Sequence, residues 1–388
     1  MKCSKNINDL FNEEELIEIL KGLIQRKSQN PLETEEEVAK YVQHLLIENN
    51  IKAELSYASP GRPNVIAKIK GAGDGPTILY NGHLDVVPAG CDWNIDPFDG
   101  IIKDDRMYGR GTADMKSGVA AMIYAAIILN RMGNRFLGQL ILFFNVDEER
   151  ENLGMLKFLE EEHKADFAII SEPTSLDICI GHKGVARYRV KTYGTNGHVS
   201  FVEKPDNALY KMTKLINELE KLSFVVKEKE HPLIGKASLA VTQIKGGTAP
   251  NIVPNYCEIE IDRRLLPGEK QEEVLSQIEE CLNIIAKSNN FEYELENYLF
   301  IPASYIDESH SFIKQVSQSI LAVKKHEPEI KAFEACCEAP FLSVEKGIPT
   351  IICGPGNLQQ AHVTDEYVEL NQVKDASKIF IDLILRML

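Results

Sequence analysis

Histidine and carboxylate side chains follow the apolar segments of this 388-residue chain, at the points where those segments end. In open α/β sheets, ligands bind beyond the carboxyl ends of the strands, so these positions are candidates for chemistry. Each residue alone would be ordinary: a histidine in a turn, an acid in a loop or an aspartate that caps a helix. With Asp114, which instead precedes a predicted apolar helix, they form one set of imidazole and carboxylate groups: His83, Asp85, Asp114, Asp147, Glu148, Glu149, Glu172 and His362.

This set matches the needs of two divalent ions such as zinc. Three ionised carboxylates and a bridging hydroxide balance four positive charges, and the eight cysteines include no C-x-x-C pair that would hold zinc by thiolates. Asp85 lies two residues after His83, so in an extended segment both side chains point to the same side. We therefore expect the Asp85 carboxylate to accept a hydrogen bond from the imidazole N–H that faces away from the metal.

Helices and short strands must hold these groups in place. Hydrophobic periodicity predicts helices over residues 13–26, 35–49, 115–132, 152–162, 207–222 and 269–288. Short apolar segments predict strands over residues 64–69, 77–80, 139–146, 166–170 and 349–353. Their alternation predicts an α/β fold: a largely parallel, mixed sheet with helices on both faces.

A different pattern of apolar and polar residues interrupts this alternation of strands and helices. Residues 185–191 and 257–262 alternate apolar with polar side chains, as half-solvated antiparallel strands do. The sequence thus predicts an inserted α+β domain over residues 182–293. Residues 1–181 and 294–388 would form the two parts of the larger domain.

The charge excludes several classes of partner. The chain has 43 basic and 58 acidic side chains, a net charge of −15, which argues against nucleic acid and anionic membranes. The longest apolar stretch, residues 119–129, is too short to span a bilayer, and no apolar segment follows the lysines at the N-terminus as in a signal peptide. We expect a cytoplasmic protein whose cysteines are free thiols.

Four motifs in this order resemble the M20 family of metallopeptidases and deacylases, over nearly the whole chain. They are Gly82-His83-Leu84-Asp85-Val86-Val87-Pro88, Tyr108-Gly109-Arg110-Gly111-Thr112-Ala113-Asp114-Met115-Lys116-Ser117-Gly118, Asp147-Glu148-Glu149 and Ser171-Glu172-Pro173-Thr174. The resemblance implies that His83 and Glu172 bind one metal ion, Glu149 and His362 bind another, and Asp114 bridges the two. It also implies zinc or cobalt as the metal, Glu148 as the general base and a cis peptide bond between Asp114 and Met115.

The predicted inserted domain carries further motifs of this family, and the resemblance implies that the domain serves as a lid or dimerisation domain. The resemblance implies that His198, in Gly194-Thr195-Asn196-Gly197-His198-Val199-Ser200, stabilises the oxyanion, in several members from the other subunit of a homodimer. It implies that Asn251 and Arg264 bind substrate, and a planar guanidinium suits an α-carboxylate. A turn histidine and a surface arginine are the ordinary alternatives for His198 and Arg264.

The C-terminal motifs resemble the acetylornithine deacetylase branch of the family. They contain Glu338 and Gly356 as candidate substrate-binding residues, with Cys337 where that branch commonly has threonine. We expect hydrolysis of an N-acyl group, acetyl first, from an amino acid such as N2-acetylornithine. Glu338 could pair with a substrate amine, or it could be a structural carboxylate or one that supports the metal ligands. A succinyl-diaminopimelate desuccinylase, a dipeptidase or carboxypeptidase, and a noncatalytic metal-binding homologue are the alternatives.

Overall fold

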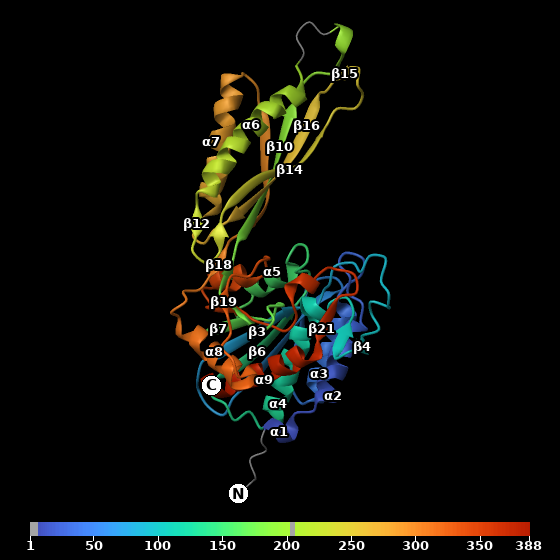
Figure 1. Cartoon of the computed structure of the whole chain (residues 1–388), viewed down its shortest axis with the longest axis vertical. Helices are drawn as coiled ribbons and strands as arrows, with labels where there is room; N and C mark the ends of the chain where they lie inside the picture. The colour runs from blue at the N-terminus through green and yellow to red at the C-terminus, as the bar shows by residue number, and fades with distance from the viewer. Residues whose placement is uncertain (1–6, 202–205) are drawn as a thin grey trace. The chain divides into compact units, whose positions relative to one another are not determined.

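The chain divides into two compact units. The computed structural model describes residues 7–201 and 206–388; Cys3 and most of the N-terminal segment considered for a signal peptide lie outside them (Figure 1). The large unit contains the chain up to Ile180 together with Ile306–Phe333 and Cys337–Leu388, and the inserted unit contains Gly181–Tyr305 and Glu334–Cys336. The inserted unit extends past the boundary expected at residue 293, because strand β17 (Tyr293–Ile301) pairs with strand β10 (Gly184–Tyr193).

The large unit is built on an eight-stranded sheet of mixed direction. Strand β3 pairs in parallel with β6 and β7, and β7 pairs in parallel with β20, whereas β1, β2 and β6 are antiparallel neighbours. The predicted α/β fold with a mostly parallel central sheet is confirmed. In spatial order the strands are β1 (Ala53–Ser59), β2 (Arg62–Lys70), β6 (Gln139–Asn145), β3 (Thr77–His83), β7 (Phe167–Ile170), β20 (Thr350–Ile352), β8 (Ile178–Cys179) and β19 (Ile330–Lys331).

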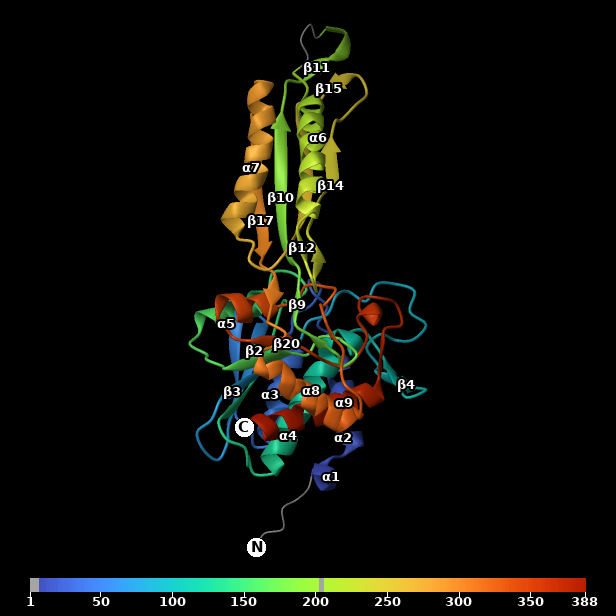
Figure 2. The same ribbon diagram turned by 60° about the vertical axis from the view of Figure 1, so that its left-hand side comes forward.

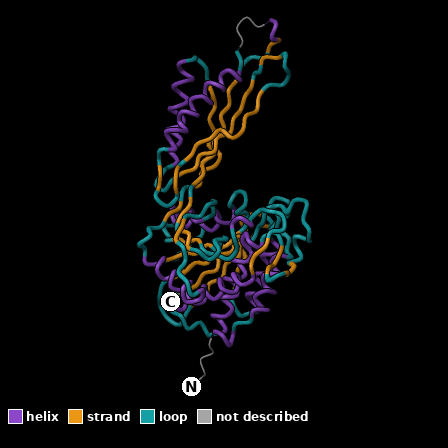
Figure 3. The backbone as a smooth tube through the Cα atoms, viewed as in Figure 1, coloured by secondary structure: helices purple, strands orange, loops and turns teal. Residues whose placement is uncertain are grey.

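Helices cover both faces of this sheet (Figure 3). The ring of Tyr80 in β3 packs against Phe380 of α9, while Phe143 in β6 stacks on Phe158 of α5. Tyr80 pairs with Leu142, the residue before Phe143, so α9 and α5 lie on opposite faces. The helices of this unit are α1 (Ile7–Leu10), α2 (Glu13–Ile24), α3 (Glu36–Glu48), α4 (Ser117–Arg131), α5 (Leu153–Glu160), α8 (Ser311–Lys324) and α9 (Leu370–Met387).

Helix α4 is the core helix of the large unit. In the described part of the chain, Thr112–Arg131 alone is long and apolar enough to cross a membrane, but 94% of its most apolar window is buried inside the protein. Helices α2 and α9 pack against it. The helix is apolar because protein surrounds it on all sides.

The inserted unit is an antiparallel sheet with two helices packed beside each other (Figure 2). The strand order is β14 (Ser238–Gly246), β16 (Tyr256–Leu265), β10 and β17. Helix α6 (Ala208–Lys227) packs on β14, β10 and β16, and helix α7 (Gln271–Ser288) contacts α6 and β17. Along β16 buried and half-buried residues alternate, which is the period that predicted a half-solvated strand.

Small ladders complete the two units. In the large unit, β5 (Arg106–Tyr108) pairs with β4 (Ile101–Lys103) and with β21 (Tyr367–Glu369). In the inserted unit, β11 (Gly197–His198) pairs with β15 (Ile252–Val253), and β12 (Glu230–His231) with β13 (Gly235–Lys236). Strands β9 (Gly181–His182) and β18 (Ser304–Tyr305) also pair. In the described part of the chain, the free thiols include Cys91, Cys257, Cys281, Cys336 and Cys353.

Candidate metal centre

Five candidate metal ligands reach one edge of the central sheet, at the ends of different segments. His83 is the last residue of β3, and Glu172 comes two residues after β7. Asp114 lies in the turn that leads into α4, and its peptide bond to Met115 is cis, as the family resemblance implied. Parallel strands place their carboxyl ends at the same edge, which brings residues distant in the sequence together.

Asp114 lies between the two imidazoles. Its Oδ1 is 3.1 Å from Nε2 of His83, and its Oδ2 is 3.2 Å from Nε2 of His362. The side chain of Asp114 is only 11% exposed, whereas that of His362 is 50% exposed, so this cluster opens to solvent on the His362 side. One carboxylate therefore faces two nitrogen donors through separate oxygens.

Glutamates complete the two sides of this arrangement. Glu149 Oε1 lies 3.1 Å from Nε2 of His362, and Glu172 Oε1 lies 4.0 Å from Nε2 of His83. Ligand atoms of His83, Asp114 and Glu149 all lie within 4.8 Å of one another. This donor set of imidazole nitrogens and carboxylate oxygens fits one or two divalent cations.

The pKa values of the cluster indicate a strong demand for positive charge. Burial opposes charge on His83, but its hydrogen bond to Asp114 and the nearby carboxylates hold its pKa well above the usual range. Hydrogen bonds to Asp114 and Glu149 raise the pKa of His362 to about 10. Burial, reinforced by the charge of Asp114, raises the pKa of Glu172 well above its usual value. Divalent cations would replace these protons.

Asp85 supports the turn that carries Glu148 and Glu149. Its carboxylate accepts hydrogen bonds from the main-chain N–H groups of both glutamates, at 3.1 Å each, and from the Asn30 side chain. The imidazole of His83 bonds instead to the main-chain oxygen of Asp85, 2.9 Å from Nδ1, while the carboxylate is 3.6 Å away. The prediction that the Asp85 carboxylate accepts a hydrogen bond from the His83 imidazole is thus wrong. The N–H groups of Glu148 and Glu149 bond to that carboxylate instead.

Glu148 lies in a desolvated part of this cluster. Burial raises its pKa well above the usual value; the charge of His83 opposes this shift, and that of Glu149 adds to it. A carboxylate with a raised pKa is suited to accept and return a proton near neutral pH.

Comparison with known proteins identifies the family of this chain. Residues 79–386 match the profile of Peptidase family M20/M25/M40. This chain belongs to that family. It is a metal-dependent amide hydrolase, as the family resemblance of its motifs predicted.

Three curated relatives align with most of this M20 hydrolase. Acetylornithine deacetylase of Vibrio cholerae is 32% identical over 91% of this chain and 93% of its own. A pyrimidine deformylase, N-formyl-4-amino-5-aminomethyl-2-methylpyrimidine deformylase of Bacillus subtilis, is 27% identical over 96% and 95%. A probable succinyl-diaminopimelate desuccinylase of Staphylococcus aureus is 28% identical over 96% of both.

Solved structures share the fold of the M20 hydrolase. An aminopeptidase PepT from Bacillus cereus superposes with a TM-score of 0.81 at 20% identity, covering 97% of this chain and 99% of its own. A Bacillus subtilis protein described as a dinuclear metal binding peptidase of the M20 family has a TM-score of 0.74 at 19% identity, covering 97% and 99%. The fold is therefore that of M20 peptidases.

Glu338 and Gly356 both lie beside the metal cluster of the M20 hydrolase. The buried carboxylate of Glu338 accepts the side-chain amide of Asn145 at 2.7 Å, and burial raises its pKa to about 8. Gly356 has a positive φ of 91°, and a Cβ there would lie 3.3 Å from Ala113 and 3.4 Å from Pro173. Ala113 precedes Asp114 and Pro173 follows Glu172, so a glycine here lets two ligand-bearing segments approach.

The remaining predicted residues belong to the inserted unit. His198 in β11 is exposed and pairs with Ile252, the residue after Asn251, whose main-chain oxygen accepts the N–H of Val199. His198 and Asn251 are thus close together. Arg264 is further along the sheet, where its Nε donates to Asp262 at 2.7 Å.

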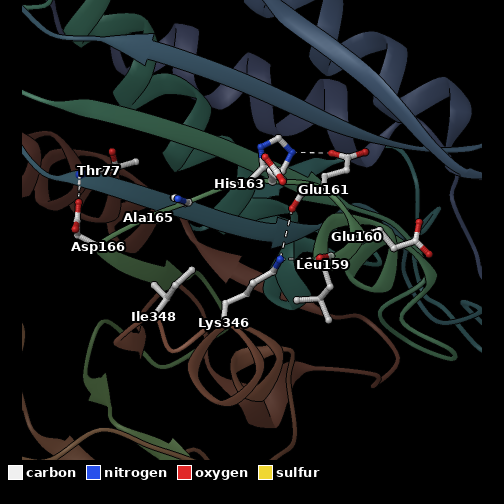
Figure 4. A pocket seen from close by; sticks show the side chains of 11 residues that line it. Thr77, Leu159, Glu160, Glu161, His163, Ala165, Asp166, Lys346 and Ile348 are labelled. Atoms are coloured by element: carbon white, nitrogen blue, oxygen red, sulfur yellow. Dashed lines mark hydrogen bonds and ion pairs between the residues drawn. The ribbon is translucent and has the colours of Figure 1, made fainter.

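Each unit has an open groove whose lining includes none of the candidate metal ligands. One of about 650 Å³ is lined by Thr77, the first residue of β3, whereas His83 ends that strand, so this groove is at the opposite edge of the sheet (Figure 4). Lys346 in this groove donates to the main-chain oxygen of Leu159, and Asp166 accepts the N–H of Thr77. A second groove, of about 600 Å³, lies beside the His198 and Asn251 loops.

Sequence reasoning missed several residues that support the site. Asn30 donates to both Asp85 and Asp147, and Arg62 pairs with Glu35 at 2.6 Å and with Asp147 at 3.2 Å. No spacing rule connects these segments. Asn145 could have been noticed, because it is a polar residue that ends an apolar strand two residues before Asp147.

Proposed function

We propose that this M20 hydrolase removes an acetyl group from the amino nitrogen of an amino acid such as N2-acetylornithine. One observation carries the proposal: Asp114 directs one carboxylate oxygen to each of two imidazoles, an arrangement suited to a carboxylate that would bridge two adjacent cations. The relatives named acetylornithine deacetylase favour acetyl as the acyl group.

The ligands divide between two ions, zinc or cobalt. His83 and Glu172 would hold one ion, Glu149 and His362 the other, and Asp114 both. When bound, such ions supply Lewis acidity to the scissile carbonyl and to the attacking water. The main-chain oxygen of Asp85 fixes the ring of His83, so that Nε2 faces Asp114 and would be available to hold an ion.

Glu148 is the proposed base and acid. Its carboxylate accepts a proton from water as the water oxygen attacks the amide carbon. It then returns the proton to the departing amine nitrogen as the carbon–nitrogen bond breaks, so one residue serves both steps. Asp85 holds the main chain of Glu148 in place during this transfer.

Three further residues are proposed to serve substrate recognition. Arg264 binds the α-carboxylate of the substrate, and Glu338 and Gly356 line the side of the metal cluster. Glu338 is 2% exposed and is bonded to Asn145, which supports a role in shaping the pocket over a direct contact with a substrate amine.

His198 is proposed to act from the partner subunit of a homodimer. Arg264 pairs with Val185 at one end of strand β10, and the His198 loop follows Tyr193 at the other end. Eight residues of extended strand span about 26 Å, which no small substrate bridges. Within one inserted unit, His198 and Arg264 therefore cannot both contact the same N-acyl amino acid.

The edge strand β14 is the proposed dimer contact. It ends the four-stranded sheet on one side, and its residues 242–246 are exposed, including Ile244 at 53%. A second copy can pair with this edge antiparallel about a two-fold axis. Sedimentation of the protein and of Ile244→Lys should show a dimer and a monomer, respectively; a monomeric parent protein contradicts the proposal.

A substrate panel tests the reaction. The protein, loaded with zinc or cobalt, is assayed for acetate, succinate, formate or amino-acid release from N-acetyl, N-succinyl and N-formyl amines and from dipeptides. We expect N2-acetylornithine or a close N-acetyl amino acid to give the highest kcat/KM. Preference for a succinyl substrate or a dipeptide selects the desuccinylase or peptidase alternative, and no turnover by metal-loaded protein favours a noncatalytic homologue.

The protein is proposed to work in the cytoplasm, without nucleic acid or membrane as a partner. The buried position of α4 and free thiols such as those of Cys257 and Cys353 support this location.

A further inference from the structure

A buried ion pair connects the segments that carry two of the proposed metal ligands. Arg110 and Glu366 are 3% and 0% exposed, and Arg110 Nη1 lies 2.6 Å from Glu366 Oε2. Both residues flank the ladder in which Tyr108 of β5 pairs with Tyr367 of β21. Neither residue has a role in the reaction proposed above.

Glu366 holds the turn of Asp114. Its Oε1 accepts the main-chain N–H of Ala113 at 2.7 Å and that of Asp114 at 3.2 Å. The Glu366 carboxylate therefore uses one oxygen for Arg110 and the other for the backbone of the bridging residue. Burial raises the pKa of Glu366 to about 7, and the charge of Arg110 counteracts the shift.

Arg110 holds the segment of His362. The same Nη1 donates to the main-chain oxygen of Val363, the residue after His362, at 3.2 Å. These contacts form a closed ring from Asp114 through Glu366, Arg110 and Val363 to His362, whose imidazole returns to Asp114.

The two proposed metal positions differ in how firmly they are held. His83 ends a strand paired with β6 through Asn145, so the sheet fixes it. His362 follows the short helix Leu358–Gln360 in the connection from β20 to β21, with a positive φ of 64° and an exposed side chain. Outside contacts must therefore fix His362.

We propose that Arg110 and Glu366 form a positioning pair that sets the distance between His362 and Asp114. The pair thereby sets the affinity for the ion that His362 and Glu149 would hold. This inference rests on the proposed function, because it presumes that His362 and Asp114 bind a metal. The pair acts through the ligands and touches neither metal nor substrate.

Cobalt titration tests the pair. Binding of two Co²⁺ ions is followed by calorimetry and by the visible absorption of the metal, and His362→Ala identifies which ion uses His362. We expect Glu366→Gln to lower the affinity for the ion that uses His362 by roughly 10–100-fold, and the affinity for the other ion by less than about threefold. The control Arg106→Gln, which removes the half-exposed pair of Arg106 with Glu369 on the same ladder, should leave both affinities unchanged.

A second variant covers the case in which Glu366→Gln does not fold. The double variant Arg110→Met with Glu366→Gln removes both charges of the buried pair, so that no charge is left buried without its partner. It should lower the affinity for the ion that uses His362 and leave the other affinity unchanged. Equal weakening of both ions, or unchanged affinities in a protein that binds two, overturns the positioning role and leaves the proposed function intact. If the parent protein does not bind two ions, both the positioning role and the proposed function are overturned.

Discussion

The carboxylate of Asp85 accepts the main-chain N–H of Glu148, with 3.1 Å between the nitrogen and Oδ1. This bond connects the end of β3 to the turn after β6 and fixes the backbone of the proposed base relative to His83. The position of the proton acceptor thus depends on an aspartate that is not itself a proposed ligand.

Asp85→Asn should lower kcat by roughly 10–100-fold without loss of metal. An amide nitrogen would face one of the two N–H groups that now bond to the carboxylate, while the main-chain oxygen that holds His83 remains. Kinetics and metal analysis of the purified variant measure both quantities. The exposed Asp99→Asn is the control, and an unchanged kcat in Asp85→Asn would refute the role.

Glu148→Gln should lower kcat by about 10²–10⁴-fold, the usual contribution of a general base, because an amide cannot accept the proton of water. The metal content should equal that of the parent protein, since Glu148 is not a proposed ligand. Glu151→Gln, an exposed glutamate of the same turn, should retain full activity. Loss of metal from Glu148→Gln would instead identify Glu148 as a ligand.

Gly356→Ala should destabilise the protein by roughly 1–3 kcal/mol through a strained positive φ and contact with Ala113 and Pro173. Gly347→Ala separates these causes, because Gly347 has a φ of 66° and no atom within 4 Å of its Cβ position. Urea unfolding should show the larger loss for Gly356→Ala, and metal binding should weaken in that variant alone. Equal losses would show that crowding contributes nothing.

Glu35→Gln should make stability less dependent on pH. Burial raises the pKa of Glu35 from 4.5 to about 8; the charge of Asp85 adds to the shift and that of Arg62 opposes it. Because the folded-state pKa is above the unfolded value, the contribution of Glu35 is fully present below pH 4.5 and is lost as pH rises to about 8. The stability of Glu35→Gln relative to the parent protein should therefore increase across that interval.

Urea unfolding of both proteins at a series of pH values measures this difference. Glu36→Gln is the matched control, because Glu36 is the next residue and its side chain pairs with Lys40 at the surface. A constant difference between Glu35→Gln and the parent protein would contradict the prediction.

The sequence alone determined the architecture of the large unit and the residue types of its site. Helices predicted over residues 13–26 and 115–132 appear as α2 and α4 with ends shifted by one or two residues. Period and burial decide such elements locally. His83 and Glu172 were found as candidates because parallel strands deliver their last residues to one edge of the sheet. The division of the ligands between two ions was implied by the resemblance to the M20 family.

Tertiary structure alone decided the contacts that support these residues. Asn30, Arg62 and Glu366 reach the site from distant segments, and the sequence has no periodicity that relates Glu366 to Ala113. The bond predicted between Asp85 and His83 went to the main-chain oxygen, because two N–H groups of a turn 63 residues away compete for the carboxylate. The strand spacing that separates His198 from Arg264 likewise follows from the register of β10 and β16. Sequence spacing determines which groups are available, but the pairing of buried donors with acceptors depends on which segments meet in space.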